Sequence, residues 1–118
     1  MPIFDLKGSL TAWLKDNLIF SVSGAAAAYL NGENVINYAG VHCGSLKNGF
    51  FRDHGGNIVA FIKGATGGPM LPVTKTPPVA PMPGVAPIKP VAPMTPVQAL
   101  PSLNWSGLSW RQFISKPE

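Results

Sequence analysis

The sequence predicts an all-β fold in which four 16-residue β-hairpin repeats fill residues 2–65 around a common axis. A glycine recurs every 16 residues, and a short polar residue always stands three positions before it. Four positions after each glycine the residue is small, and two positions further on it is large and aliphatic. Self-similarity at a fixed period indicates a repeat architecture in which each unit is one supersecondary element. The repeated positions are Gly8, Gly24, Gly40 and Gly56; Ala12, Ala28, Gly44 and Ala60; and Leu14, Leu30, Leu46 and Ile62.

The polar residues before the glycines have the chemistry of hairpin tips. Short polar side chains accept a hydrogen bond from the backbone amide two residues later. With glycine at the fourth position, such a residue suits a type I turn closed by a left-handed glycine. The sequence therefore predicts tips that begin at Asp5, Ser21, Asn37 and Asp53.

Apolar residues on both sides of each tip predict eight short strands. Between the first two units the chain reads Lys15-Asp16-Asn17, and between the next two it reads Asn31-Gly32-Glu33, which is tight-turn composition. Short connections of this kind favour antiparallel neighbours. The predicted strands cover residues 3–4, 10–14, 18–20, 26–30, 35–36, 42–46, 50–51 and 58–62.

Side chains alternate between two faces along a strand, so the second, fourth and sixth positions after each glycine share one face. We expect this face to be the core, with Leu10, Ala12 and Leu14 in the first unit. Units of one length can close on themselves, which removes exposed sheet edges. The pattern leaves open whether the strands close as a barrel or splay as petals.

The opposite face carries large aromatic residues at one repeat position, namely Trp13, Tyr29 and Phe61, where the third unit has Ser45. Such a row would be an exposed apolar band unless something covered it. We predict that these aromatic residues form a face on which the chain's own tail docks. The alternative is a binding face that stacks on sugars or bases.

A proline-rich tail follows the repeats. Prolines between Pro69 and Pro96 recur in one phase of a three-residue period, interrupted at Lys75 and Gly84. This period is typical of a polyproline II helix. The intervening residues are mostly apolar, so we predict that the segment docks on the β domain in cis. Capture by another protein in trans is the alternative, since residues 75–81 match a basic-x-x-Pro-x-x-Pro pattern.

After Pro101 the chain regains apolar residues and should pack back on the hairpins. Ser109 and Gln112 have the spacing of a capping box, which predicts a short helix over residues 110–115. The expected organisation is a four-hairpin domain (1–66), a proline-rich segment (67–101) and a C-terminal aromatic segment with the helix (102–118). The apolar residues of the last segment are Leu103, Trp105, Leu108, Trp110, Phe113 and Ile114.

Composition and charge argue against several classes of protein. Apolar residues make up 46% of the chain and charged residues 12%, the reverse of a disordered composition. The net charge of +4 comes mostly from scattered basic residues of the tail, so no nucleic-acid partner is expected. No apolar run is long enough to span a bilayer and no signal peptide is recognisable, so a cytoplasmic location without membrane contact is expected, with unconventional export as the open alternative.

The residues that carry chemistry elsewhere have structural explanations here. His42 and Cys43 are neighbours on a predicted strand, so their side chains should point to opposite faces and cannot share a metal. His54 is expected at an exposed tip, and the carboxylates of Asp5 and Asp53 occupy tip positions that Ser21 and Asn37 fill in other units. Cys43 is the single cysteine, which excludes an intrachain disulfide. We therefore expect no catalytic residue, no metal site and no cofactor.

Several stretches of the chain resemble the 4-fold beta flower proteins, a bacterial family. The resemblance lies in the N-terminal Pro2-Ile3-Phe4-Asp5, the repeated hairpins, residues 59–69 (VAFIKGATGGP), the proline run and residues 102–110 (SLNWSGLSW). It implies hairpins arranged as petals about a pseudo-fourfold axis, which agrees with the 16-residue period. It implies no activity, substrate, cofactor or site residue.

The function expected from the sequence is that of a non-enzymatic structural or protein-interaction module. Its partner would be an unidentified protein bound through the tail or the aromatic face, and self-association is left open. The alternative is a module for a small ligand or carbohydrate, bound at the aromatic face or in an axial pocket.

Overall fold

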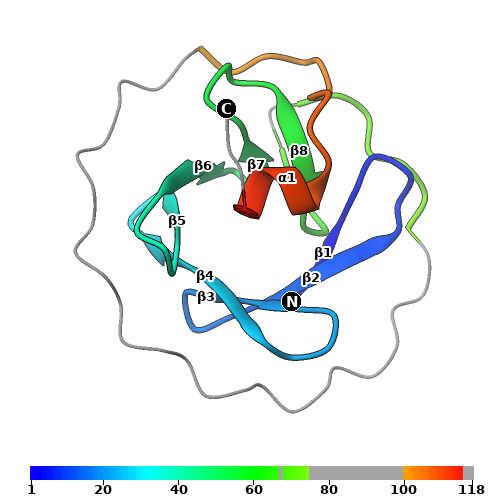
Figure 1. The fold of residues 1–118 in the computed structure, drawn as a ribbon. Coiled ribbons are helices and arrows are strands. Elements are labelled where there is room, and N and C mark those ends of the chain that lie inside the picture. The colour runs from blue at the N-terminus through cyan, green and yellow to red at the C-terminus, as the bar shows by residue number, and fades with distance from the viewer. Residues whose placement is uncertain (67, 75–99, 116–118) are drawn as a thin grey trace.

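The eight predicted strands close into an antiparallel barrel. The computed structural model describes residues 1–66, 68–74 and 100–115, and within them strands pair in sequence order around the barrel (Figure 1). One short helix follows at the C-terminal end. The elements are β1 (Pro2–Phe4), β2 (Leu10–Lys15), β3 (Leu18–Ser21), β4 (Ala26–Asn31), β5 (Asn34–Asn37), β6 (His42–Lys47), β7 (Phe50–Arg52), β8 (Ile58–Phe61) and α1 (Trp110–Ser115).

The four hairpin tips have the predicted turn chemistry. In the first tip the amide of Gly8 donates to the carbonyl of Asp5 at 2.9 Å, and the three other tips repeat this bond at 2.9–3.0 Å. The carboxylate Oδ1 of Asp5 accepts from the amides of Lys7 and Ser9. Gly8 has a φ of 75°, which is the left-handed conformation that the turn requires of its fourth residue.

A bulge at the start of the second strand of each hairpin changes which residues face the core. In the fourth hairpin Arg52 pairs with Ile58 but Phe51 pairs with Ala60, so Val59 is the extra residue, and the other hairpins repeat this shift. Val59 packs in the central core, whereas Ile58 packs in a separate cluster on the outer side. The expectation that the second position after each glycine faces inward is therefore wrong, because the bulge interrupts the alternation that it assumed.

The core inside the barrel repeats with the hairpins. One ring of buried side chains comes from the first strand of each hairpin, and the small residues of the second strands lie between them. Half-buried aliphatic residues beside the inter-unit turns pack against this core, namely Leu14, Leu30, Leu46 and Ile62. The ring consists of Ile3, Ile19, Val35 and Phe51, and the small residues are Ala12, Ala28, Gly44 and Ala60.

Outside the barrel, residues 68–74 run along the junction of the fourth and first hairpins. Leu71 packs on an outer cluster that contains Phe4, Phe50, Ile58 and Phe61. A β-carbon on Gly68 would lie 2.5 Å from the ring of Phe50, so this glycine allows the close approach. The predicted polyproline II segment falls mainly on residues 75–99, which lie outside the described residues, so its docking stays a prediction.

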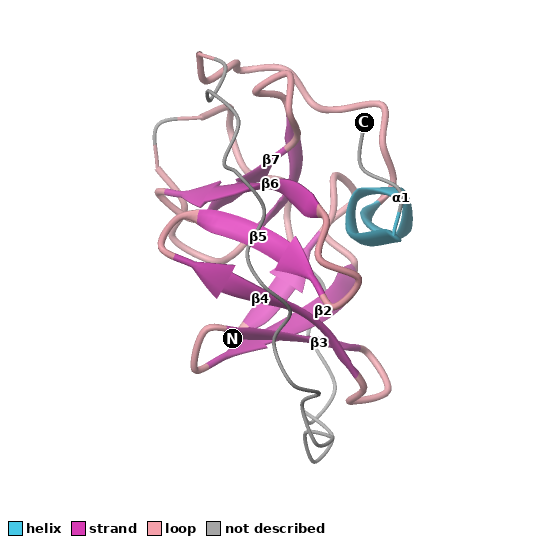
Figure 2. Ribbon diagram, turned by 60° about the vertical axis from the view of Figure 1, so that its left-hand side comes forward, coloured by secondary structure: helices cyan, strands magenta, loops and turns pink. Residues whose placement is uncertain are grey.

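The helix α1 covers part of one end of the barrel, on the side of β6 and β8 (Figures 1 and 2). Its predicted capping box is present: the amide of Ser109 donates to Gln112 Oε1 at 2.9 Å, and the amide of Gln112 donates to Ser109 Oγ at 3.2 Å. Phe113 is fully buried in the central core. No helix within the described residues is long and apolar enough to cross a membrane.

Candidate binding cleft at the hairpin tips

Residues 102–106, which we call the strap, extend the sheet at the tip of the fourth hairpin. β8 pairs with β1 at Phe61 and Phe4, near the other end of β8, so Ile58 has a free edge on that side. The strap fills this edge: Ile58 donates its amide to the carbonyl of Asn104 at 3.0 Å and accepts from the amide of Ser106 at 2.7 Å. The strap is thus a short parallel addition to the barrel, with Trp105 bridged to Ile58.

Arg52 fixes the start of the strap. Its Nη1 donates to the carbonyl of Gly56 at 2.7 Å and to the carbonyl of Ser102 at 2.6 Å. The residue is only 6% exposed, and burial lowers the pKa of its guanidinium. The other hairpins have Phe4, Phe20 or Ile36 at this position. Only the fourth hairpin therefore carries a cation at the position that holds the strap.

Asp53 fixes the other end of the strap. Its Oδ1 closes the tip by accepting from the amides of Gly55 and Asn57. Its Oδ2 accepts from the hydroxyl of Ser106 at 2.5 Å, and Ser106 Oγ in turn accepts from the amide of Leu108 at 3.1 Å. Both carboxylate oxygens of this tip are therefore used.

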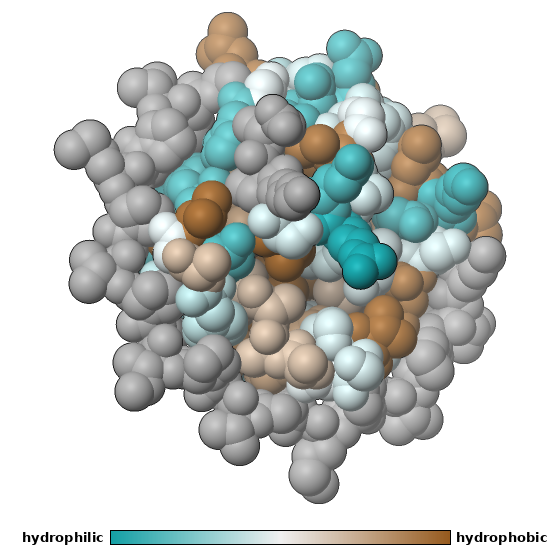
Figure 3. Space-filling view, viewed as in Figure 1, coloured by the Kyte–Doolittle hydropathy of each residue, from teal (hydrophilic) through white to brown (hydrophobic). Residues whose placement is uncertain are grey.

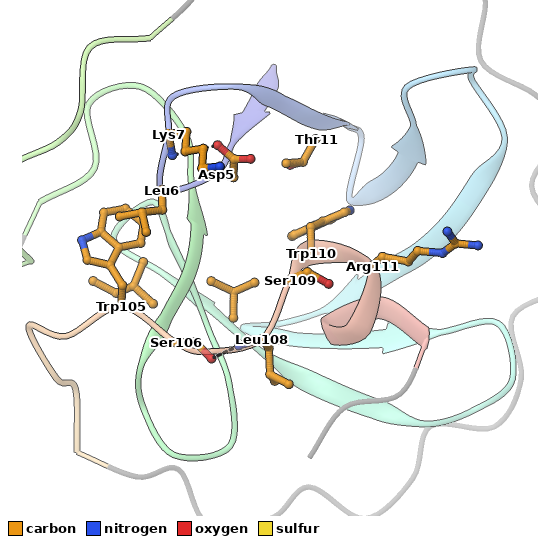
Figure 4. Close-up of a pocket in the computed structure, with 12 residues that line it drawn as sticks. Asp5, Leu6, Lys7, Thr11, Trp105, Ser106, Leu108, Ser109, Trp110 and Arg111 are labelled. Carbon is orange, nitrogen blue, oxygen red and sulfur yellow. Dashed lines mark hydrogen bonds between the residues drawn. The ribbon is translucent and has the colours of Figure 1, made fainter.

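A cleft of about 440 Å³ lies between the first hairpin tip and residues 105–111, where the strap ends and α1 begins (Figure 4). We call it the tip cleft. Ile58 and Val59 lie behind the lining with their side chains buried, and the first tip contributes Leu6, which is about half exposed. The remaining lining residues are Asp5, Lys7, Thr11, Trp105, Ser106, Leu108, Ser109, Trp110 and Arg111.

Two tryptophans line the tip cleft from different parts of the C-terminal segment (Figure 4). The ring of Trp105 meets the ring of Phe61 at 71° with centroids 6.1 Å apart. The ring of Trp110 meets that of Phe51 at 86° and 5.2 Å, and it also contacts Phe113. These core contacts hold both indoles in place, and each remains partly exposed. The cleft therefore has pre-positioned aromatic surface.

The polar groups that line the tip cleft include both negatively and positively charged side chains. Asp5 closes its turn with Oδ1, and no described residue donates a hydrogen bond to its Oδ2. Thr11 uses its hydroxyl hydrogen on the carbonyl of Ile3 at 3.1 Å. Lys7 is exposed beside the cleft, whereas the guanidinium of Arg111 points away from it (Figure 4). The site thus offers a carboxylate and an ammonium around an apolar floor.

The three aromatic residues singled out from the sequence lie on different hairpins, and the structure does not bring them into one cleft. Phe61 is fully buried under Trp105 and Leu71. Tyr29 is 4% exposed, with its ring 5.7 Å from that of Tyr38. Trp13 is half-buried, and its Nε1 is buried with no hydrogen-bond partner among the described residues. Their role as a ligand-binding or tail-docking face stays a prediction.

His42 and Cys43 point to opposite sides, as expected. Cys43 belongs to the central core, and burial raises the pKa of its thiol to about 11. His42 Nε2 lies 2.9 Å from Asn34 Oδ1, and its Nδ1 lies 3.0 Å from Nε2 of His54 on the next tip. The ring centroids are 5.2 Å apart, so the rings meet at their nitrogen edges rather than face to face. This pairing between two hairpins was not foreseen from the sequence.

The described residues contain no group of three or more His, Cys, Asp or Glu that could hold a metal ion. Sequence reasoning treated Trp105 and Trp110 only as packing residues and Asp5 only as a turn residue. The sequence feature that could have indicated the cleft is Arg52, which stands where the three other hairpins have an apolar residue. It marks the hairpin on which the C-terminal segment docks, and hence where the two tryptophans lie.

A comparison with models of protein families matches residues 1–114 to the model described as 4-fold beta flower protein. No curated protein and no solved structure matches the chain.

Proposed function

The chain belongs to the 4-fold beta flower family, whose description gives an architecture and no activity, and we propose that it is a non-enzymatic binding module whose ligand site is the tip cleft. The observation that carries the proposal is the cleft itself, where two indoles flank an apolar floor beside a carboxylate with a free oxygen. Ligand sites are typically concave and mostly apolar, with a few placed polar groups.

The proposal of a non-enzymatic role is supported by the state of the reactive side chains. Cys43 lies in the core with a raised pKa, which disfavours the thiolate that nucleophilic chemistry needs. Ser106 donates its hydroxyl hydrogen to Asp53 Oδ2 at 2.5 Å. The hydroxyl also accepts from the amide of Leu108, so its position is explained by holding the chain between the strap and α1.

Binding at the tip cleft can be located with fluorine NMR of the 5-fluorotryptophan-labelled full chain, which reports its three tryptophans separately. A screen of small ring compounds should include ligands that shift the Trp105 and Trp110 signals saturably and leave Trp13 unchanged. A screen that shifts neither cleft tryptophan would overturn the proposal.

A matched pair of variants tests whether the first tip forms the site. Leu6 and Val22 occupy the same turn position of the first and second hairpins, and both are about half exposed. Leu6→Ser removes apolar surface from the cleft and should weaken binding, whereas Val22→Ser removes similar surface elsewhere and should not. Equal effects of the two substitutions would place the ligand outside the cleft.

An interaction module is the second candidate, favoured by the way the strap docks. Backbone pairing along a free strand edge is a general mode of capturing an extended segment. The strap and α1 are joined to the barrel through residues 75–99, and exchange of the C-terminal segment between two copies would preserve every contact of the strap. Light scattering coupled to gel filtration tests this: a dimer that Arg52→Met weakens supports exchange, and a monomer at all concentrations contradicts it.

A further inference from the structure

We infer that the ligand of the tip cleft is a neutral ring that carries several hydroxyl groups, of the size of one or two sugar rings. This inference rests on the function proposed above and names the chemical class of its ligand. The cleft of about 440 Å³ lies toward the lower end of the ~300–1,000 Å³ that ligand sites span. A ligand of this volume fills it without requiring a groove for a polymer.

The two indoles favour a ligand with an apolar ring face. Trp105 and Trp110 lie on different sides of the cavity in Figure 4, and each is braced from behind by a buried phenylalanine. An amphipathic ring can lay its C–H face on an indole while its polar groups remain at the rim.

The free oxygen of Asp5 favours a ligand that donates through a hydroxyl. The repeat provides an internal precedent, because Asp53 occupies the same tip position in the fourth hairpin and its Oδ2 accepts the hydroxyl of Ser106 at 2.5 Å. The Oδ1 atoms of both residues make the same two turn contacts. Asp5 lines the cleft, and no described residue donates a hydrogen bond to its Oδ2.

The charged residues that line the cleft are Asp5, Lys7 and Arg111, so the cleft carries both signs of charge. A ligand anion would lie near the Asp5 carboxylate, and a ligand cation would lie near the Lys7 ammonium. A hydroxyl group satisfies both neighbours, because it donates to the carboxylate and accepts from the ammonium. Several hydroxyls on one ring can therefore use Asp5, Lys7 and the hydroxyl of Ser109 together.

The class of ligand can be tested with defined probes on the fluorotryptophan-labelled full chain. The neutral probes are the methyl pyranosides of glucose, galactose, mannose and N-acetylglucosamine; benzoate is the anionic ring and benzylamine the cationic ring. At least one pyranoside should shift the Trp105 and Trp110 signals saturably, with neither ionic ring competing. Saturable shifts by benzoate or benzylamine alone would overturn the inference and leave the proposed function standing. Absence of shifts with every probe, extended to the wider screen above, would overturn both.

Asp5→Asn tests the carboxylate without disturbing the turn, because Asn37 fills the same tip position in the third hairpin. The variant keeps the Oδ1 acceptor of the turn but replaces the free Oδ2 acceptor with an NH2 donor. The charge-assisted hydrogen bond from a ligand hydroxyl is therefore lost, and pyranoside affinity should fall by about fivefold or more. Asp16→Asn makes the same change at an exposed turn outside the cleft and should leave the affinity unchanged. Equal affinities of Asp5→Asn and the unmodified protein would overturn the inference.

Discussion

Gly44 and Phe113 lie so close that a β-carbon on Gly44 would be 2.6 Å from Cε1 of the Phe113 ring. The same β-carbon would also collide with the backbone carbonyl of Arg52. The three other hairpins have alanine at this repeat position. The third hairpin has glycine where the Phe113 ring and the Arg52 carbonyl both approach, and this close approach lets the six-residue helix α1 pack its phenylalanine against the barrel.

Gly44→Ala should therefore destabilise the protein by about 1–3 kcal/mol, because the overpacked side chain must displace either α1 or the backbone of β7. Urea unfolding followed by circular dichroism measures the change. Gly107→Ala is the matched control, since no atom lies within 4 Å of its β-carbon position, and it should change stability by less than about 0.5 kcal/mol. Equal unfolding midpoints for Gly44→Ala and the unmodified protein would contradict this packing.

Arg52→Met should loosen the strap while the barrel stays folded, because three hairpins already carry apolar residues at this position. The substitution removes two hydrogen bonds from a charged donor, which are worth about 1.5–3 kcal/mol each. Hydrogen exchange of the Ile58 and Ser106 amides, which pair barrel and strap, should accelerate by about tenfold or more. Arg111→Met, at an exposed position, serves as the control. Unchanged protection of both amides in Arg52→Met would show that the strap docks without this arginine.

The contact between His42 and His54 leads us to expect that the protein loses stability in mild acid. Burial, and secondarily the neighbouring His54, lower the pKa of His42 below its usual 6.5. The unfolded chain then binds a proton more readily than the folded one. The contribution of His42 to the free energy of unfolding should be constant above about pH 6.5 and fall as the pH drops toward its folded pKa.

Proton NMR titration of the His42 ring measures this pKa directly. His54→Asn removes the second cause of the shift and should raise the pKa of His42 part of the way toward 6.5, leaving the effect of burial. A His42 pKa at or above 6.5 in the unmodified protein would show that the ring is neither buried nor paired with His54.

Cys43 should resist alkylation in the folded protein. With a pKa of about 11, roughly 0.1% of the thiol is ionised at pH 8, and the side chain lies under α1 with its Sγ 3.5 Å from the carbonyl of Ile114. Mass spectrometry after iodoacetamide treatment should show slow labelling in buffer and fast labelling in urea. Phe113→Ala should accelerate labelling in buffer because it weakens the anchor of α1. Equally fast labelling in buffer and urea would contradict the burial of Cys43.

Local patterns predicted much of the fold because short-range chemistry determines those parts. The tip positions of Asp5 and its equivalents and the capping box of Ser109 and Gln112 need only neighbouring residues, and both are present in the structure. The period of 16 residues predicted the hairpins. It left the choice between barrel and petals open, because closure depends on pairing between the first and last strands, β1 and β8.

The remaining features depend on contacts between distant residues. A two-residue alternation cannot reveal the bulge at Val59, so the prediction that the Ile58 side chain faces the core was wrong. The contact between His42 and His54 joins two hairpins. The hydrogen bond from Arg52 to the carbonyl of Ser102 joins residues that are 50 positions apart in the sequence. The tip cleft arises only when this long-range docking brings Trp105 and Trp110 to the first hairpin.

The most direct test of the tip cleft as a ligand site is an intermolecular nuclear Overhauser measurement with a saturating pyranoside. Ligand ring protons should show cross-peaks to the indole protons of Trp105 and Trp110 and to the methyl groups of Leu6, since all three residues line one cavity. Cross-peaks to Trp13 or Tyr29 on the outer face, without any to the cleft tryptophans, would contradict the assignment of the site.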